Sequence, residues 1–169
     1  EIDEAESAAR IEAHPPVYSA RVTKSFPATV TVDVIGRRPL ATALAVTADG
    51  TVPLVFDEDG VVFQIGSGNQ VTHDFAELPV VSGLRFDGAG IGLQLPALVV
   101  EFLRDLRTLR YDAPELYALF SEYRVVRRND YVYEVVLYPM HFNVPVRIGT
   151  SIDEEMVQYI LMMLDTIKS

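Results

Sequence analysis

Consecutive carboxylates and three separate histidines are the side chains of this chain that could do chemistry. Asp57, Glu58 and Asp59 follow one another, and hard cations such as Ca²⁺ bind several carboxylate oxygens. Asp57 or Asp59 with Glu134 would also supply the paired carboxylates of a hydrolase, which lie about 5 to 10 Å apart. The further acidic ligands and terminal Glu of a calcium loop are missing, whereas Asp and Gly are typical turn residues. We therefore interpret this segment as a turn and predict no metal and no cofactor.

The histidines do not form a recognisable catalytic group. His14, His73 and His141 are far apart in the sequence, and His73 stands directly beside Asp74. A hydrolytic triad instead brings its members together from distant segments. No Gly-x-Ser-x-Gly nucleophile motif accompanies them. We predict that the protein is not an enzyme, with the carboxylate-dependent hydrolase as an alternative.

Composition excludes several classes of function. The chain has 169 residues, a net charge of -10 and no cysteine. An acidic surface repels nucleic-acid phosphates, so we predict no nucleic-acid binding. Without cysteine there are no disulfides, thiol nucleophiles or Cys-based zinc sites. The longest apolar runs, near residues 95–100 and 160–164, are much shorter than the roughly 20 residues that span a bilayer.

Hydrophobic periodicity predicts an α+β fold. Residues 3–13 have a helical pattern, and alternation over 18–24 and 29–34 around a short turn predicts a β-hairpin. Further strands are expected over 41–47, 52–56, 61–65, 124–128, 131–138 and 143–148, the last three as a meander. Amphipathic helices are expected over 95–110, after Pro114 and after Ser151. The buried stripe predicted for the last helix is Ile152, Met156, Ile160, Met163 and Ile167.

Five short patterns between residues 26 and 149 occur in the order seen in the bacterial cell-division proteins FtsQ and DivIB, and the chain resembles that family. They are a Phe-Pro turn (26–30), an Arg-x-Pro-x-Ala exit (37–41), a hairpin turned by Asp and Gly (56–63), a Leu-Pro-x-x-x-Gly element (78–83) and a strand ending in an apolar-Gly pair (146–149). The family has Glu before the Arg of the second pattern. Gly36 stands there in this chain, so no role of that carboxylate is carried over.

The resemblance implies two units. Residues 1–40 would be the C-terminal part of a POTRA domain, a helix plus a β-hairpin, and residues 41–169 the family's β domain, an antiparallel sheet with packed helices that lacks its usual last strand. The first strand and helix of the POTRA domain and a membrane-anchoring helix would lie upstream. The single-pass parent protein would then face the periplasm, at the extracytoplasmic side of the cell membrane, at the division septum.

The same resemblance implies a scaffold that binds FtsB and FtsL homologues and acts on the septal peptidoglycan synthase FtsW/FtsI. In the family, an arginine early in the strand after the short helix holds acidic residues of FtsB, and by position it corresponds to Arg124. Arg127, Tyr131 and Tyr133 lie on the same meander, and interface centres favour Arg and aromatic side chains. These four residues are the predicted partner-binding set, while a solvated strand face and core packing are the alternative interpretations.

A second assignment keeps the POTRA-like start but places it in another envelope transport or assembly system. The Leu-Pro-x-x-x-Gly element and the helix-ended β domain favour the division protein over it.

Overall fold

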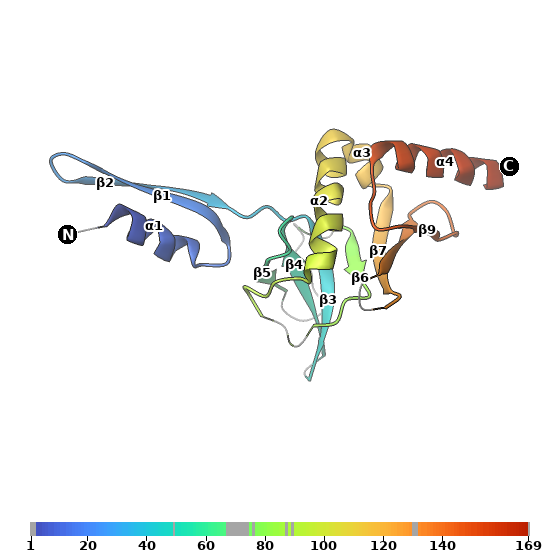
Figure 1. The fold of residues 1–169 in the computed structure, drawn as a ribbon, viewed down its shortest axis with the longest axis horizontal. Helices are drawn as coiled ribbons and strands as arrows, with labels where there is room; N and C mark the ends of the chain where they lie inside the picture. Colours follow the sequence, from blue (N-terminus) through green and yellow to red (C-terminus); the bar gives the residue numbers. More distant parts are fainter. Residues whose placement is uncertain are drawn as a thin grey trace.

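The computed structural model describes residues 3–48, 50–66, 75, 77–86, 88, 90–129 and 132–168. It has a small helix-and-hairpin unit followed by a sheet unit with its own helices (Figure 1). The first unit contains α1 (Glu4–Glu12), β1 (Val17–Ser25) and β2 (Thr29–Gly36). The second contains β3 (Ala41–Thr47), β4 (Gly50–Phe56), β5 (Val62–Ile65), β6 (Val80–Ser82), α2 (Ala97–Asp112), α3 (Pro114–Tyr117), β7 (Phe120–Arg127), β8 (Tyr133–Pro139), β9 (Val146–Ile148) and α4 (Glu154–Lys168). The predicted α+β class is confirmed, and the predicted elements occur in the expected order, with β6 as an additional strand.

The helix-and-hairpin unit extends away from the sheet unit (Figure 1). The Asp3 carboxylate accepts a hydrogen bond from the backbone N–H of Glu6 (3.0 Å) and so begins α1 as an N-cap. β1 and β2 pair as an antiparallel hairpin, with Val22 opposite Val32. The sequence predicted this hairpin from its alternation.

One face of the hairpin is apolar and only partly covered. Val22 is 6% exposed and is the one buried side chain among the described residues of this unit. On the neighbouring strand Val30, Val32 and Val34 share the same face and remain 42%, 48% and 51% exposed. This unit therefore has almost no core of its own.

The sheet unit is built on seven strands in the order β5-β4-β3-β6-β7-β8-β9. Most neighbours are antiparallel, and β7-β8-β9 is the predicted meander. The short central strand β6 runs parallel to both β3 and β7, so the sheet is mixed where a purely antiparallel sheet was expected. The difference arises because β6 enters the sheet between two strands that are distant in the sequence, and such pairings carry no local signal.

The backbone conformation at residue 83 explains why the Leu-Pro-x-x-x-Gly element ends in glycine. Val81 in β6 is fully buried, and Gly83 follows the strand with φ +79°. A Cβ atom at Gly83 would lie 2.1 Å from the backbone oxygen of Val125 on β7. Only glycine permits this left-handed conformation together with such a close approach.

The core of the sheet unit is one apolar cluster between the sheet and its helices. α2 lies across the sheet (Figure 1) and buries one stripe, namely Val99, Phe102, Leu103, Leu106 and Leu109. α4 joins the same cluster with part of the predicted stripe, because Ile152 and Ile160 are buried and Met156 packs against the cluster. Val157 and Leu164 are buried beside Ile160, whereas Met163 and Ile167 are exposed. The apolar side chains of α4 extend beyond its buried face, so helical periodicity alone did not place the edge of that face.

In the part of the chain that the structure describes, no helix has the length and apolar character needed to cross a bilayer.

Replacing Gly83 by Ala should destabilise the sheet unit severely. We expect the free energy of unfolding to fall by more than about 3 kcal/mol, because backbone strain and a backbone clash act together. Gly50 is the matched control, since its φ is +124° and, apart from its chain neighbours, no described residue has an atom within 4 Å of a Cβ built there. Gly50→Ala should lose only about 1 to 2 kcal/mol. Urea unfolding measures both, and equal losses would contradict the role given to the Val125 carbonyl.

Hydrogen exchange should separate the two units. We expect the paired amides of β1 and β2 to exchange at least about tenfold faster than those of β3, β7 and β8, because so little apolar surface protects the hairpin. Exchange measured by NMR on the whole chain tests this. Equal protection in both units would show that the hairpin opens only when the sheet unfolds.

Candidate functional site

Arg124 lies on the outer sheet face, the side of β7, β8 and β9 that faces away from the core. We define this face by Glu122, Arg124, Glu134, Tyr138 and Arg147. Arg124 donates to the Glu122 carboxylate from Nε (3.2 Å) and Nη2 (3.1 Å). Its guanidinium carbon also lies 4.7 Å from the ring centroid of Tyr138 on β8. The predicted arginine is therefore on an accessible face, held in place by a carboxylate and an aromatic ring.

A second ion-pair group continues this face toward the end of the sheet. Glu134 on β8 accepts from Arg128 Nη2 (2.9 Å) and also lies 3.5 Å from Arg147 Nη1 on β9. β9 is the last strand of the described sheet on this side. The outer sheet face thus alternates arginines with glutamates up to a short terminal strand. Exposed ion pairs of this kind contribute about 0 to 1 kcal/mol each, so a partner's carboxylates can displace them at little cost.

Sequence reasoning missed Arg147 and the two glutamates as members of this face. The alternation Val146-Arg147-Ile148 was a usable signal, because the central residue of a half-buried edge strand points to solvent. Pairing of Val136 with both Arg124 and Arg147 then brings the two arginines onto the same side of the sheet.

Tyr133 is a core residue, which corrects its place in the predicted partner-binding set. It is only 6% exposed and faces the helices, so it is not available for direct docking in this conformation. Burial raises the pKa of its hydroxyl, and Glu101 and Asp105 on α2 raise this pKa further. The physical reason is register, because Tyr133 pairs with Arg127 at a position whose side chains point to the core side.

The other two predicted residues have different outcomes. Arg127 is exposed at the end of β7 and donates from Nε to the backbone oxygen of Asn129 (3.1 Å). Arg127 on β7 pairs with Tyr133 on β8, so both residues face the core side of the sheet. Arg127 is therefore not on the outer sheet face with Arg124. Tyr131 lies outside the described residues.

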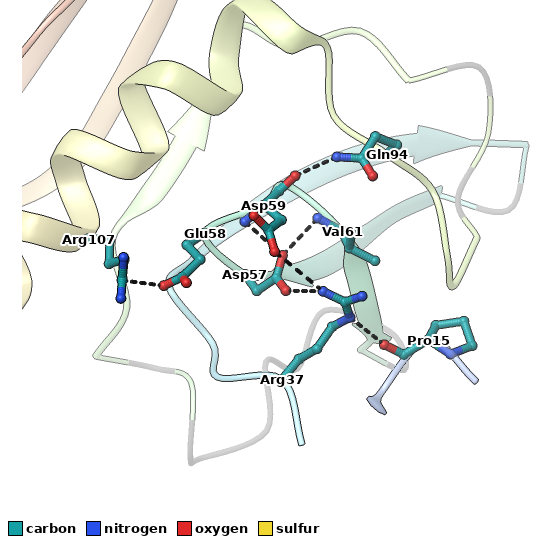
Figure 2. A network of polar contacts seen from close by, with 8 residues as sticks. All are labelled: Pro15, Arg37, Asp57, Glu58, Asp59, Val61, Gln94 and Arg107. Atoms are coloured by element: carbon teal, nitrogen blue, oxygen red, sulfur yellow. Dashed lines mark hydrogen bonds and ion pairs between the residues drawn. The ribbon is translucent and has the colours of Figure 1, made fainter. Parts of the chain in front are cut away.

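The junction between the two units holds the most buried ion pair of the described chain. Asp57 is 2% exposed at the end of β4, and its Oδ2 lies 2.5 Å from Nη1 of Arg37 (Figure 2). The other carboxylate oxygen accepts from the backbone N–H groups of Asp59 (3.1 Å) and Val61 (2.9 Å). Nε of Arg37 donates to the backbone oxygen of Pro15 in the first unit (2.8 Å). One carboxylate therefore organises its own turn and anchors the hairpin.

Residues 37–40, which we call the linker, are held at every position. Each residue makes a hydrogen bond to one of the two units, so the linker is not a free tether. Burial raises the pKa of Tyr117 to about 12, which keeps its hydroxyl protonated as a donor. The contacts are, in chain order, Arg37 N to Pro16 O (2.9 Å), Arg38 Nη1 to Tyr111 Oη (3.2 Å), Arg110 Nη1 to Pro39 O, and Tyr117 Oη to Leu40 O (2.5 Å).

The carboxylates that suggested chemistry are used for structure. Asp57 forms the predicted turn, and within the described residues no group of three or more metal-ligating side chains comes together. Glu134 lies four strands from β4 in the sheet order, which separates it from Asp57 by about 19 Å at the usual strand spacing. This distance does not fit a carboxylate pair that shares one substrate bond. His73 and Asp74 lie outside the described residues.

No family model matches this chain, and no curated protein matches it. The functional assignment therefore depends on the motifs quoted above and on the geometry of the outer sheet face and the junction.

The junction ion pair should be essential for stability. We expect Arg37→Gln to lower the free energy of unfolding by about 3 kcal/mol, because it leaves the Asp57 carboxylate buried without its counter-charge. Arg124→Gln is the matched control at an exposed pair and should change stability by less than about 1 kcal/mol.

A double-mutant cycle identifies the cause. Asp57→Asn keeps an oxygen for the turn and removes the charge, so Arg37→Gln combined with Asp57→Asn should be more stable than Arg37→Gln alone. Urea midpoints of the four proteins measure the coupling. Additive losses would mean that the pair contributes only as two separate hydrogen-bonding groups.

Proposed function

We propose that this chain is the extracytoplasmic part of a bacterial division protein of the FtsQ/DivIB type and that it works as a scaffold without catalysis. In this role the outer sheet face binds homologues of FtsB and FtsL. Through them the protein recruits or regulates septal peptidoglycan synthesis by FtsW/FtsI. The scaffold acts at the periplasmic side of the cell membrane, where an upstream anchor holds the parent protein.

The observation that carries the proposal is the position of Arg124. The residue that the family resemblance assigns to binding acidic groups of the partner is exposed on a sheet face, beside Tyr138 and two strands from the end of the sheet. Arginine and tyrosine in contact on an accessible surface are the side chains that dominate protein interfaces. A buried Arg124, or one on the helix-covered side, would have contradicted the assignment.

The terminal strand supports the same binding mode. β9 pairs with β8 and is the last strand of the described sheet, so it offers its second edge to an added strand. Backbone hydrogen bonds would then provide affinity, and the alternating arginines and glutamates beside this edge would select a partner of complementary charge.

The first unit supports the POTRA assignment. Its helix, its hairpin and its half-exposed valine row are what remains of a βααββ domain when the first strand and the first helix are removed. The valines at 30, 32 and 34 are then the surface that those elements cover.

Calorimetry tests the scaffold. This chain, and a version extended by its native downstream residues, are titrated with the extracytoplasmic segments of FtsB and FtsL from the same organism. We expect binding by one or both versions, and Arg124→Glu should weaken it by about tenfold or more, because it opposes like charges in the interface. Arg104→Glu, an exposed change on α2, is the control and should leave affinity within about twofold. Failure of both versions to bind would instead favour the envelope transport module.

A further inference from the structure

Two adjoining hollows lie where the linker meets α2. Their volumes are about 230 and 320 Å³, and both are lined by Arg38, Glu58, Arg107 and Tyr111, which we call the junction groove. Pockets for small molecules and cofactors usually measure about 300 to 1,000 Å³. Hollows close to this lower limit accept one or two side chains of a bound segment more readily than a cofactor.

The groove is positively charged in a strongly acidic protein. Arg38, Arg107 and Arg110 line it against the single carboxylate of Glu58, since Asp57 is neutralised by Arg37. Three positive charges minus one negative charge leave a formal charge of +2, while the whole chain carries -10. Such a local reversal of sign attracts an acidic ligand, whereas the net negative charge of the whole chain disfavours association with a second copy.

Two of these arginines keep donors for a ligand. Arg38 is exposed, and its one described hydrogen bond goes to the Tyr111 hydroxyl. Arg107 uses Nε for Glu58 (2.6 Å, Figure 2), which leaves its terminal nitrogens without a partner among the described residues. A guanidinium carries five N–H donors in a planar fork that matches a carboxylate. The two guanidinium groups are therefore held in place by these contacts and keep N–H donors for hydrogen bonds to a ligand.

Aromatic rings flank the arginines. The guanidinium of Arg107 lies 5.6 Å from the ring centroid of Tyr111, and Arg38 donates to the hydroxyl of the same tyrosine. Tyr111 is 53% exposed, and Tyr18 from the first unit, 49% exposed, lines the same hollow. Arg and Tyr around a shallow hollow form a typical centre of a peptide interface.

From this arrangement we infer that the junction groove is a second docking site, which binds an acidic peptide segment of a partner protein. Arg38 and Arg107 bind its carboxylates, and the two tyrosines pack against a neighbouring side chain. In the free protein Glu58 forms an ion pair with Arg107, and the bound segment displaces Glu58 from it. Because residues from both units line the groove, the Arg37–Asp57 pair that joins the units also preserves the site. This site is separate from the outer sheet face and does not depend on the proposed partners.

The probe is a blocked peptide, Ac-GEEYEEG-NH₂, titrated into the whole chain and followed by ¹H–¹⁵N NMR, including the arginine Nε–H signals. We expect shifts concentrated at Arg38, Arg107 and Tyr111. Arg38→Gln and Arg107→Gln should each weaken binding roughly five- to tenfold, because each removes charge-assisted hydrogen bonds. Glu58→Gln should strengthen binding about threefold, because it removes the internal competitor of the peptide. Arg104→Gln, also on α2, is the matched control and should have no effect.

Glu58→Gln is expected to strengthen peptide binding, whereas the arginine variants are expected to weaken it. The test therefore stays valid even where an arginine variant alters folding. Equal binding of the glutamine analogue, Ac-GQQYQQG-NH₂, or shifts spread over the surface would overturn the inference. Inorganic phosphate binding as tightly as the peptide would overturn it as well, since the groove would then be a general anion site. Arg124→Glu should leave peptide binding unchanged, so the groove and the outer sheet face succeed or fail separately.

Discussion

The contact between Arg37 and Asp57 is the constraint on which the arrangement of the two units depends. Asp57 uses one carboxylate oxygen to form the turn after β4 and the other to hold Arg37, which in turn holds the Pro15 carbonyl. The pair is nearly buried, so neither charge can be removed alone without leaving the other unsolvated. The path of the linker and the shape of the junction groove both follow from it.

The position of β6 decides which residues the sheet presents to solvent. By running parallel between β3 and β7, it joins the two halves of the sheet into one surface with a single helix-covered core. Gly83 allows the chain to leave this strand directly beside the Val125 carbonyl. With β7 fixed in this register, Arg124 faces outward and Tyr123 inward, where Phe102 and Phe120 pack against its ring. The composition of the outer sheet face is thus a consequence of how the centre of the sheet is packed.

Local patterns predicted more of the fold than of the sites. Alternation and turn residues located the hairpin and the meander, and helical spacing of apolar residues located the helix over residues 95–110, close to the observed α2. In the stripe predicted for α4, Met163 and Ile167 are exposed, because the apolar side chains of that helix extend beyond its buried face. Tyr133 was wrongly grouped with Arg124, because a strand's register across a loop decides which side each residue faces.

The sequence by itself determined the α+β class, the order of most elements, the turn at Asp57 and the net acidic charge of the chain. These properties depend on composition and on spacings within a few residues. Only the tertiary structure decided that β6 is parallel to its neighbours, that Glu134 is distant from Asp57, and that Arg38 and Arg107 meet at one groove. Those relations join residues that are far apart along the chain, and long-range packing selects them without leaving a local pattern to read.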